Sequence, residues 1–227
     1  MIKVAILIDG AFFLKRYRSL NQQKKGFNEY DPVATAKDLR EMAWGHINKD
    51  KQKDQLYLYR ILYYDCHPLT KKVHNPITKK CIDFEKSKYA KFKNDFFNEL
   101  KKQRKLALRL GVVKDHAGWV LRAEPTKELL SGKKQVEELE ENDVYYDMQQ
   151  KGVDIRIGVD IAALAYKRLV DRIVLISGDS DFVPAAKVAR REGIDFVLDP
   201  MWNHIDDKLF EHIDGLKTTV NKPPRQT

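Results

Sequence analysis

The chain has 227 residues, of which 43% are hydrophobic and 10% aromatic, and this composition excludes a disordered chain. The apolar run Val4–Ile8 is followed at once by Asp9, so it is too short for a signal peptide or a membrane span. Two cysteines do not form a disulfide framework. We therefore expect a cytoplasmic protein that does not contact a membrane.

The positive charge is concentrated in one stretch. The formal net charge is +9, and the stretch from Cys66 to Leu110 alone holds 13 basic against 4 acidic residues. A localised basic surface favours a polyanionic partner, most often nucleic acid, although lysines kept for solubility are the alternative. The lysines predicted to contact nucleic acid are Lys71, Lys72, Lys79, Lys80, Lys88 and Lys91.

Short apolar runs alternate with helical patterns along the chain. The expected strands cover residues 2–8, 56–64, 172–177 and 194–198. The expected helices cover residues 31–47, 89–100, 161–170 and 182–193. This alternation predicts an α/β fold with a central, mostly parallel sheet between two layers of helices.

No clean domain boundary is visible. We expect one domain over residues 1–215, with a basic insertion at about 65–110 and an irregular insertion at about 111–150. The irregular insertion suggests a hairpin around Gly118–Trp119. Residues 216–227 are expected to be a flexible tail.

Two groups of aromatic residues have different predicted roles. Tyr89, Phe92 and Phe96 recur at helical spacing, so we expect them to pack in the core rather than to stack on bases. Trp119 and the pair Tyr145–Tyr146 are less regular, and they are candidates to line a groove for a single nucleic-acid strand.

Several aspartates are predicted to meet at one edge of the sheet. Asp9 ends the first strand, Asp179 and Asp181 follow the strand at 172–177, and Asp160 is expected to open a helix at the same edge. An all-carboxylate set suits Mg²⁺ or Mn²⁺ better than Zn²⁺. The alternative is a helix cap for Asp179 and Asp181 and a first-turn residue for Asp160. A structural role is more strongly favoured for Asp154, as a cap or turn residue, and for Asp199, as a turn residue before Pro200.

Three segments resemble a known family. "VAILIDGAFF", "KGVDIRIGVDIAALA" and "VLISGDSDFVPAAKVARREGIDFVL" are similar, in order and spacing, to the signature blocks of the NYN domain, in its LabA-like branch of the PIN-like nuclease superfamily. The resemblance implies a PIN-like, Rossmannoid three-layer α/β/α fold and a nuclease that hydrolyses RNA phosphodiester bonds at an aspartate-bound Mg²⁺ or Mn²⁺ centre. The catalytic and metal-binding positions that it implies are Asp9, Asp160, Asp179 and Asp181. Supporting roles are assigned to Lys151, Asp154 and Ser177.

The chain departs from the family pattern at one point. Many relatives have asparagine soon after the first "DG", whereas this chain has Ala11, Phe12 and Phe13. Two alternatives to a ribonuclease therefore stay open: a nucleic-acid-binding module with a weak or inactive acidic site, and a Toprim-like metal-dependent phosphotransfer domain. The expected partner is single-stranded or structured RNA, with DNA as a second possibility, and the sequence leaves a homo-oligomer open.

Overall fold

The protein is described by a computed structural model that covers residues 1–48 and 55–222. Its centre is a seven-stranded sheet with the strand order β6-β5-β2-β1-β7-β8-β9. Neighbouring strands are parallel except β5 and β6, which pair antiparallel. The strands are β1 (Ile2–Asp9), β2 (Leu56–Cys66), β5 (Leu106–Leu121), β6 (Val144–Lys151), β7 (Arg172–Ile176), β8 (Asp195–Asp199) and β9 (Gly215–Leu216).

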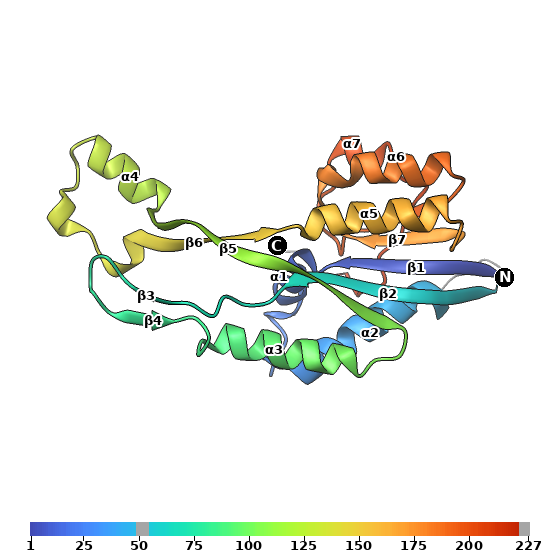
Figure 1. The fold of residues 1–227 in the computed structure, drawn as a ribbon, viewed down its shortest axis with the longest axis horizontal. Helices are drawn as coiled ribbons and strands as arrows, with labels where there is room; N and C mark the ends of the chain where they lie inside the picture. The colour runs from blue at the N-terminus through green and yellow to red at the C-terminus, as the bar shows by residue number, and fades with distance from the viewer. Residues whose placement is uncertain (49–54, 223–227) are drawn as a thin grey trace.

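Helices cover both faces of this sheet (Figure 1). Apolar side chains of α1 (Gly10–Asn21), α2 (Pro32–Asn48) and α3 (Lys88–Lys101) pack on one face. Those of α5 (Val153–Tyr166), α6 (Val183–Arg191) and α7 (Asp207–Phe210) pack on the other. The central strands are buried from both sides, which explains their continuous apolar runs. The predicted PIN-like three-layer fold is confirmed.

The aromatic residues of α3 occupy the core as predicted, with one exception. Phe92 and Phe96 are buried and stack on each other, whereas Tyr89 lies 40% exposed at the start of the helix. The helix begins directly after Ser87, whose hydroxyl caps it by accepting from the backbone amide of Ala90. The regular spacing of these side chains therefore serves packing.

An arm extends from the sheet (Figure 1). It consists of the short hairpin β3 (Lys72–His74) and β4 (Cys81–Asp83), the outer half of β5, the helix α4 (Ala123–Leu130) and β6. The hairpin expected at Gly118–Trp119 is wrong. Residues 106–121 form one long strand instead. Its pairing with β6 shifts register at a β-bulge between Asp115 and Gly118.

The arm has a small aromatic core. The rings of Trp119 and Tyr146 pack edge to face with centroids 5.6 Å apart, and Phe84 lies 5.5 Å from Tyr146. These contacts explain two of the three aromatic residues assigned to a nucleic-acid groove, because rings that pack on one another stabilise the arm itself. Tyr145 is 39% exposed, and the guanidinium of Arg122 lies over its ring.

Helix α5 begins seven residues earlier than expected, at Val153 rather than at Asp160. Val153, Ile157 and Ile161 are buried at spacings of four, so the first two turns already pack on the sheet. Gly152 precedes the helix with φ of 81°, a left-handed conformation that glycine adopts without strain. The early start matters for the site, because it places Asp154 in the first turn.

The C-terminal segment is partly held in place. The backbone amide of Lys217 donates to the Leu198 carbonyl, and the Thr219 hydroxyl donates to the Met42 carbonyl. The flexible tail predicted for residues 216–227 is therefore wrong for 216–222, and residues 223–227 lie outside the described residues. Within the described part of the chain, none of the helices combines the length and the apolar character that a membrane span requires.

Candidate acidic site

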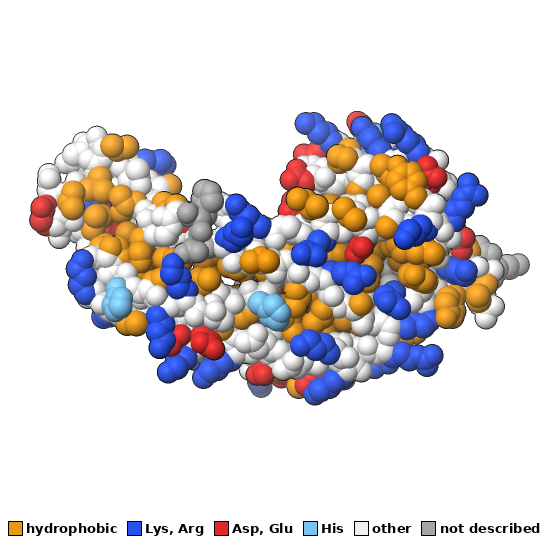
Figure 2. Space-filling model, viewed as in Figure 1, with side chains coloured by type: hydrophobic (Ala, Val, Ile, Leu, Met, Phe, Trp, Pro, Cys, Tyr) orange, Lys and Arg blue, Asp and Glu red, His pale blue; other side chains and the backbone are white. Residues whose placement is uncertain are grey.

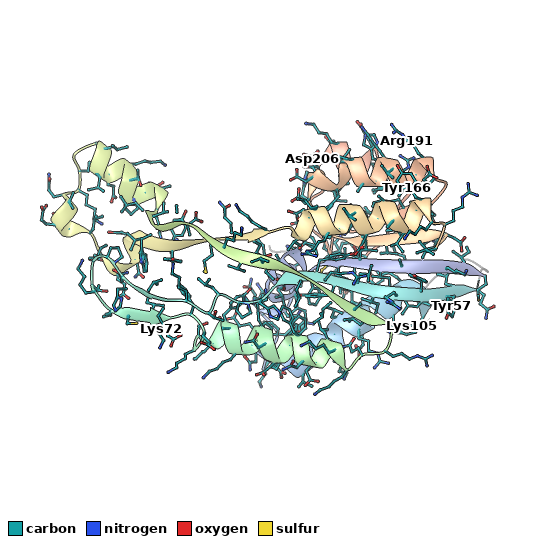
Figure 3. The ribbon with its side chains drawn as sticks, viewed as in Figure 1. Tyr57, Lys72, Lys105, Tyr166, Arg191 and Asp206 are labelled. Atoms are coloured by element: carbon teal, nitrogen blue, oxygen red, sulfur yellow. The ribbon has the colours of Figure 1, made fainter. Side chains whose placement is uncertain are left out.

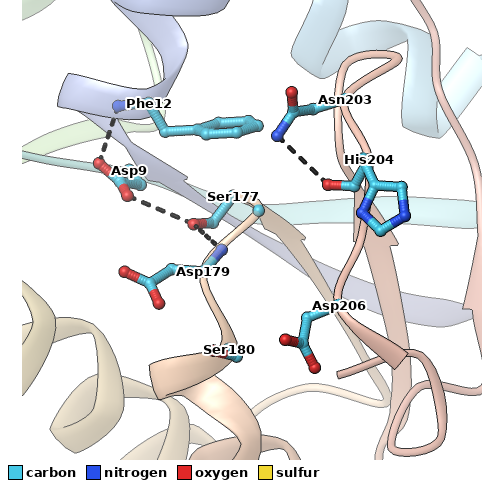
Figure 4. Close-up of a pocket in the computed structure, with 9 residues that line it drawn as sticks. Asp9, Phe12, Ser177, Asp179, Ser180, Asn203, His204 and Asp206 are labelled. Atoms are coloured by element: carbon cyan, nitrogen blue, oxygen red, sulfur yellow. Dashed lines mark hydrogen bonds between the residues drawn. The ribbon is translucent and has the colours of Figure 1, made fainter. Parts of the chain in front are cut away.

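Asp9 lies at the carboxyl end of β1 and caps α1. Its Oδ1 accepts from the backbone amide of Phe12 at 3.1 Å, and its Oδ2 accepts from the Ser177 hydroxyl at 3.3 Å (Figure 4). Burial raises the pKa of Asp9 to about 6, against the lowering effect of the Phe12 amide and with further increases from the carboxylates of Asp154 and Asp65. Ionised Asp9 is thus an energetically unfavourable charge that a cation would stabilise.

Asp179 and Asp181 lie in the loop after β7. The Oδ1 atom of Asp179 accepts from the backbone amide of Asp181 at 2.9 Å and so caps the short helix Ser180–Phe182. The amide of Asp179 donates to the Ser177 hydroxyl at 3.4 Å. Ser177 therefore connects Asp179 to Asp9 through its hydroxyl, and its supporting role stays a prediction. Asp179 has a capping role in addition to its place at the sheet edge.

These residues surround a pocket of about 500 Å³ at the carboxyl edge of the sheet (Figure 4). The residues that line it are Asp9, Phe12, Ser177, Gly178, Asp179, Ser180, Asn203, His204 and Asp206. The sequence interpretation missed the last three. They follow β8, whose carboxyl end lies at the same edge as those of β1 and β7, and this position could have identified them.

A buried hydrogen bond between His46 and Asp199 positions the loop that carries these three residues. The Nε2 atom of His46 lies 2.9 Å from Oδ2 of Asp199, and both side chains are almost fully buried. Oδ1 of Asp199 accepts from the backbone amide of Met201 at 2.8 Å. Asp199 thereby connects the end of β8 to α2 and fixes the start of the loop beside the pocket.

Asp154 belongs electrostatically to this acidic edge. Burial raises its pKa, and the carboxylates of Asp179 and Asp181 raise it further. Asp154 in turn raises the pKa of Asp9. Carboxylates that act on the pKa of Asp154, and through Asp154 on that of Asp9, must lie close to them, so the first turn of α5 faces the ends of β1 and β7.

Asp160 has a different environment from the one predicted. Its Oδ2 accepts from the Tyr64 hydroxyl at 2.8 Å and from Nε of Arg109 at 3.1 Å, and it does not line the pocket. The reason is the early start of α5, which places Asp160 almost two turns beyond Asp154. The expected convergence of four aspartates is therefore wrong. Among the side chains that the structure describes, no three from His, Cys, Asp or Glu are grouped closely enough to hold a metal ion.

The acidic edge nevertheless fits a hard divalent cation in its chemistry. Asp9 and Asp179 offer carboxylate oxygens to one open pocket, and the hydrogen bonds to Asp9 come from an amide and a hydroxyl rather than from a cation. Mg²⁺ commonly uses one or two protein carboxylates and keeps water and substrate phosphate as its other ligands. Two carboxylates at an open pocket meet that requirement, with Asp154 and Asp181 adding negative charge nearby.

A second carboxylate at the edge, Asp65 at the end of β2, is fully compensated. Nζ of Lys93 lies 2.5 Å from its Oδ1, and the backbone amide of Cys66 donates to the same oxygen at 2.7 Å. The Tyr63 hydroxyl donates to Oδ2 at 3.1 Å. Both members of the ion pair are almost completely buried. This ion pair could not be predicted from the sequence, because Lys93 is one of many lysines in the basic stretch.

The lysines predicted to bind nucleic acid have local partners in several cases. Lys72, which Figure 3 labels on the arm, lies 3.6 Å from Asp83, and Lys80 lies 2.9 Å from Glu141. The ammonium of Lys79 donates to the Pro76 carbonyl. Such pairs reduce the charge available for phosphates, although exposed pairs are weak and can exchange partners.

The other predicted basic residues lie in three places: just before β3, on α3 and at the end of β6. Lys71 lies 5.8 Å from the ring centroid of Tyr146. Lys88 and Lys91 are exposed on α3, in the helical layer on the other face of the sheet from α5. Lys151 is exposed at the end of β6, two residues before α5 begins. Their role in binding nucleic acid stays a prediction.

The departure from the asparagine pattern has a structural explanation. Phe13 is buried in the core, and Phe12 lines the pocket against Gly178, where an added Cβ atom would lie 2.8 Å from the Phe12 ring. Phe12 and Phe13 therefore pack against the residues around the site. An amide group is still present at the pocket, because Asn203 lines it and donates to the His204 carbonyl at 3.2 Å.

Comparisons with known proteins place the chain in a family. The model of the NYN domain matches residues 3–204. A search of curated proteins finds no significant match. Among solved structures, the chain is similar to a protein of unknown function from Vibrio parahaemolyticus RIMD 2210633, with 14% sequence identity, a TM-score of 0.44, and coverage of 95% of this chain and 91% of the other.

Proposed function

Because the chain belongs to the NYN domain family, a branch of the PIN-like nucleases, we propose that it is a metal-dependent ribonuclease that hydrolyses RNA phosphodiester bonds at its acidic edge. One observation carries the proposal. Asp9 and Asp179 face one open pocket, and the pKa of Asp9 is raised to about 6 by burial and by neighbouring carboxylates. A group of carboxylates that repel one another is unfavourable for stability alone, and it suits the binding of Mg²⁺ or Mn²⁺.

Asp9 and Asp179 are the residues that would hold the cation, and Asp154 and Asp181 would add negative charge beside it. A bound divalent cation supplies a water nucleophile and stabilises the leaving oxygen of an in-line displacement. Ser177 orients Asp9 through its hydroxyl and limits the rotation of that side chain. The family resemblance implies that hydrolysis leaves a 5′-phosphate and a 3′-hydroxyl.

This proposal does not include Asp160 among the residues that bind the metal ion. Its carboxylate holds Arg109 and Tyr64, so it positions α5 against β2 and β5. The expected substrate is single-stranded or structured RNA inside the cell, with DNA as a second substrate to be tested. Phosphate contacts from the exposed lysines would bind the backbone without reading its sequence.

Two observations favour a second function, in which the protein binds nucleic acid with little cleavage. The acidic residues do not form a closed metal-binding group among the described residues, and Phe12 stands where many relatives have a nearby asparagine. Both features suit a nucleic-acid-binding module with little turnover. The family match sets aside the Toprim-like alternative.

Cleavage assays with matched variants separate these two functions. Labelled RNA and DNA are incubated with the protein in Mn²⁺, in Mg²⁺ and in chelator, and the wild type is compared with Asp179→Asn and with Asp95→Asn. Asp95 is an exposed carboxylate on α3, so its variant controls for the loss of one negative charge. We expect metal-dependent RNA cleavage that Asp179→Asn lowers by at least about 100-fold and that Asp95→Asn leaves unchanged. Salt-sensitive binding with no cleavage in any metal would contradict the nuclease and support the binding module.

A further inference from the structure

Helix α5 is apolar on both of its faces. One face carries Val153, Ile157 and Ile161 into the core. The opposite face exposes Ile155, Val159 and Tyr166, which are 73%, 60% and 63% accessible to solvent. The exposed residues follow helical spacing, with Ala162 completing the series. We call Ile155, Val159, Ala162 and Tyr166 the α5 stripe.

An apolar stripe of this kind requires a covering surface. Contiguous exposed apolar patches on a monomer mark places where another molecule docks. Figure 2 shows hydrophobic side chains along the lobe that contains α5, and Figure 3 labels Tyr166 near its end. The stripe is not part of the acidic pocket, because none of its residues lines that pocket.

The spacing of the α5 stripe is self-complementary. Its residues are separated by four, three and four positions, so the series reads the same in both directions along the helix. Two copies of α5 crossing antiparallel about a twofold axis would therefore place Ile155 against Tyr166 of the other copy, and Val159 against Ala162. This is the requirement of an isologous interface, in which one surface contacts itself.

The charges at the two ends of α5 also favour a second copy. Its N-terminal end carries Asp154, beside Asp179 and Asp181, while its C-terminal end is followed by the exposed cations Lys167 and Arg168. An antiparallel arrangement brings the acidic end of each helix beside the basic end of the other. A uniformly anionic partner, such as a membrane surface, would instead be repelled by the acidic end.

Gly158 permits a close approach of the two helices. It lies in the middle of α5, and an added Cβ atom would meet nothing within 4 Å. Glycine is less favourable than alanine inside a helix, and no described residue lies close enough to Gly158 to require glycine there. From the stripe, the end charges and this glycine, we infer that the α5 stripe is the twofold interface of a homodimer.

The size of the interface determines the expected affinity. The stripe extends over about 16 Å of helix, at about 1.5 Å per residue. One pair of crossing helices buries less than the roughly 1,200–2,000 Å² of a standard stable interface. The dissociation constant is therefore expected in the micromolar range, and the dimer also places Lys167 and Arg168 of one copy near the acidic edge of the other.

Sedimentation velocity over about 1–200 µM protein tests the dimer at these affinities. We expect the full chain to dimerise and Val159→Glu to weaken association by at least about 100-fold, because the variant buries an unpaired charge. Leu130→Glu is the matched control, since Leu130 is 85% exposed on α4. A wild-type chain that stays monomeric up to the highest concentration, or a Val159→Glu variant that dimerises normally, would overturn the inference.

Cross-linking tests the antiparallel register. In a Cys81→Ser background, which removes the exposed native thiol and leaves Cys66 buried, Ile155→Cys is combined with Tyr166→Cys. We expect mild oxidation to link two chains covalently, whereas Leu130→Cys in the same background should stay unlinked. Equal cross-linking of both variants would contradict the register. Neither experiment measures RNA cleavage, so failure of the dimer and failure of the nuclease can be distinguished.

Discussion

Two aspartates at the ends of adjacent strands have opposite surroundings. Asp65 is the last residue but one of β2 and is held by a buried lysine, a tyrosine hydroxyl and a backbone amide. Asp9 ends β1 and pairs in register with Tyr64, the residue beside Asp65. Among the described residues it accepts from an amide and a hydroxyl, and it faces a pocket. Both carboxylates occur at the same sheet edge, so their position does not explain the difference.

The difference lies in charge compensation. At Asp65 the chain supplies its own cation, Lys93, and the pair is removed from solvent. At Asp9 burial raises the pKa, the neighbouring carboxylates Asp154 and Asp65 raise it further, and the carboxylate faces a pocket. A compensated carboxylate stabilises the fold, whereas an uncompensated carboxylate beside a pocket is available to a ligand. This contrast separates structural from functional aspartates more sharply than sequence position does.

The largest expected effect comes from removing the compensation at Asp65. Lys93→Gln leaves a buried, unpaired carboxylate and should destabilise the protein by about 3–5 kcal/mol. Urea unfolding of the variant measures this directly. The double variant Lys93→Met with Asp65→Leu should recover most of the loss, because it removes both charges together. A loss below about 1 kcal/mol in Lys93→Gln would show that the pair is not the main support of this edge.

The opposite change in stability is expected at Asp9. Folding raises the pKa of Asp9 from 3.8 to about 6, so the folded state binds more protons between these values and its stability falls as the pH rises through them. Asp9→Asn should therefore be nearly neutral below pH 4 and should stabilise the metal-free protein by up to about 3 kcal/mol above pH 7. The variant keeps an oxygen for the Phe12 amide. Thermal unfolding at several pH values measures the difference.

Metal binding and the pH dependence of RNA cleavage test the same role of Asp9. Mn²⁺ or Mg²⁺ should stabilise the wild type above pH 6, where Asp9 is ionised, and should not stabilise Asp9→Asn. RNA cleavage should rise with pH through the same range. If Asp9→Asn were less stable than the wild type at pH 8 in chelator, Asp9 would be a structural residue like Asp65, and the contrast between the two would fail.

The sequence predicted those parts of the site that depend on strand ends. The runs before Asp9 and Asp179 are continuous and apolar, so their carboxyl ends could be located to within one residue, and the ligand-binding edge followed from the parallel topology. The start of α5 could not be located in this way, because Gly152 and Asp154 also suit a turn. Only the packing of Val153 and Ile157 on the sheet shows that the helix begins there.

Other features depend on contacts between segments that are distant in sequence. Lys93 belongs to a lysine-rich helix, and its burial is set by Asp65 on a strand 28 positions away. The loop with Asn203 and Asp206 reaches the pocket because β8 lies beside β7. The arm was predicted as irregular, since a bulged strand and a short helix lack a clear period. Tertiary contacts, rather than local preference, determine these parts.

The smallest expected effect distinguishes Asp154 from Asp160 on the same helix. Asp154 is coupled to Asp179 and Asp181, whereas Asp160 is paired with Arg109 and therefore resembles the compensated Asp65. Asp154→Asn should lower RNA cleavage by about tenfold, because it removes negative charge beside the cation. Asp160→Asn should change cleavage by less than about threefold and stability by less than about 1 kcal/mol, since its ion pair is partly exposed. Cleavage rates of both variants at saturating Mn²⁺ measure the contrast. A greater loss in Asp160→Asn would show that the helix rearranges when substrate binds and brings Asp160 to the edge.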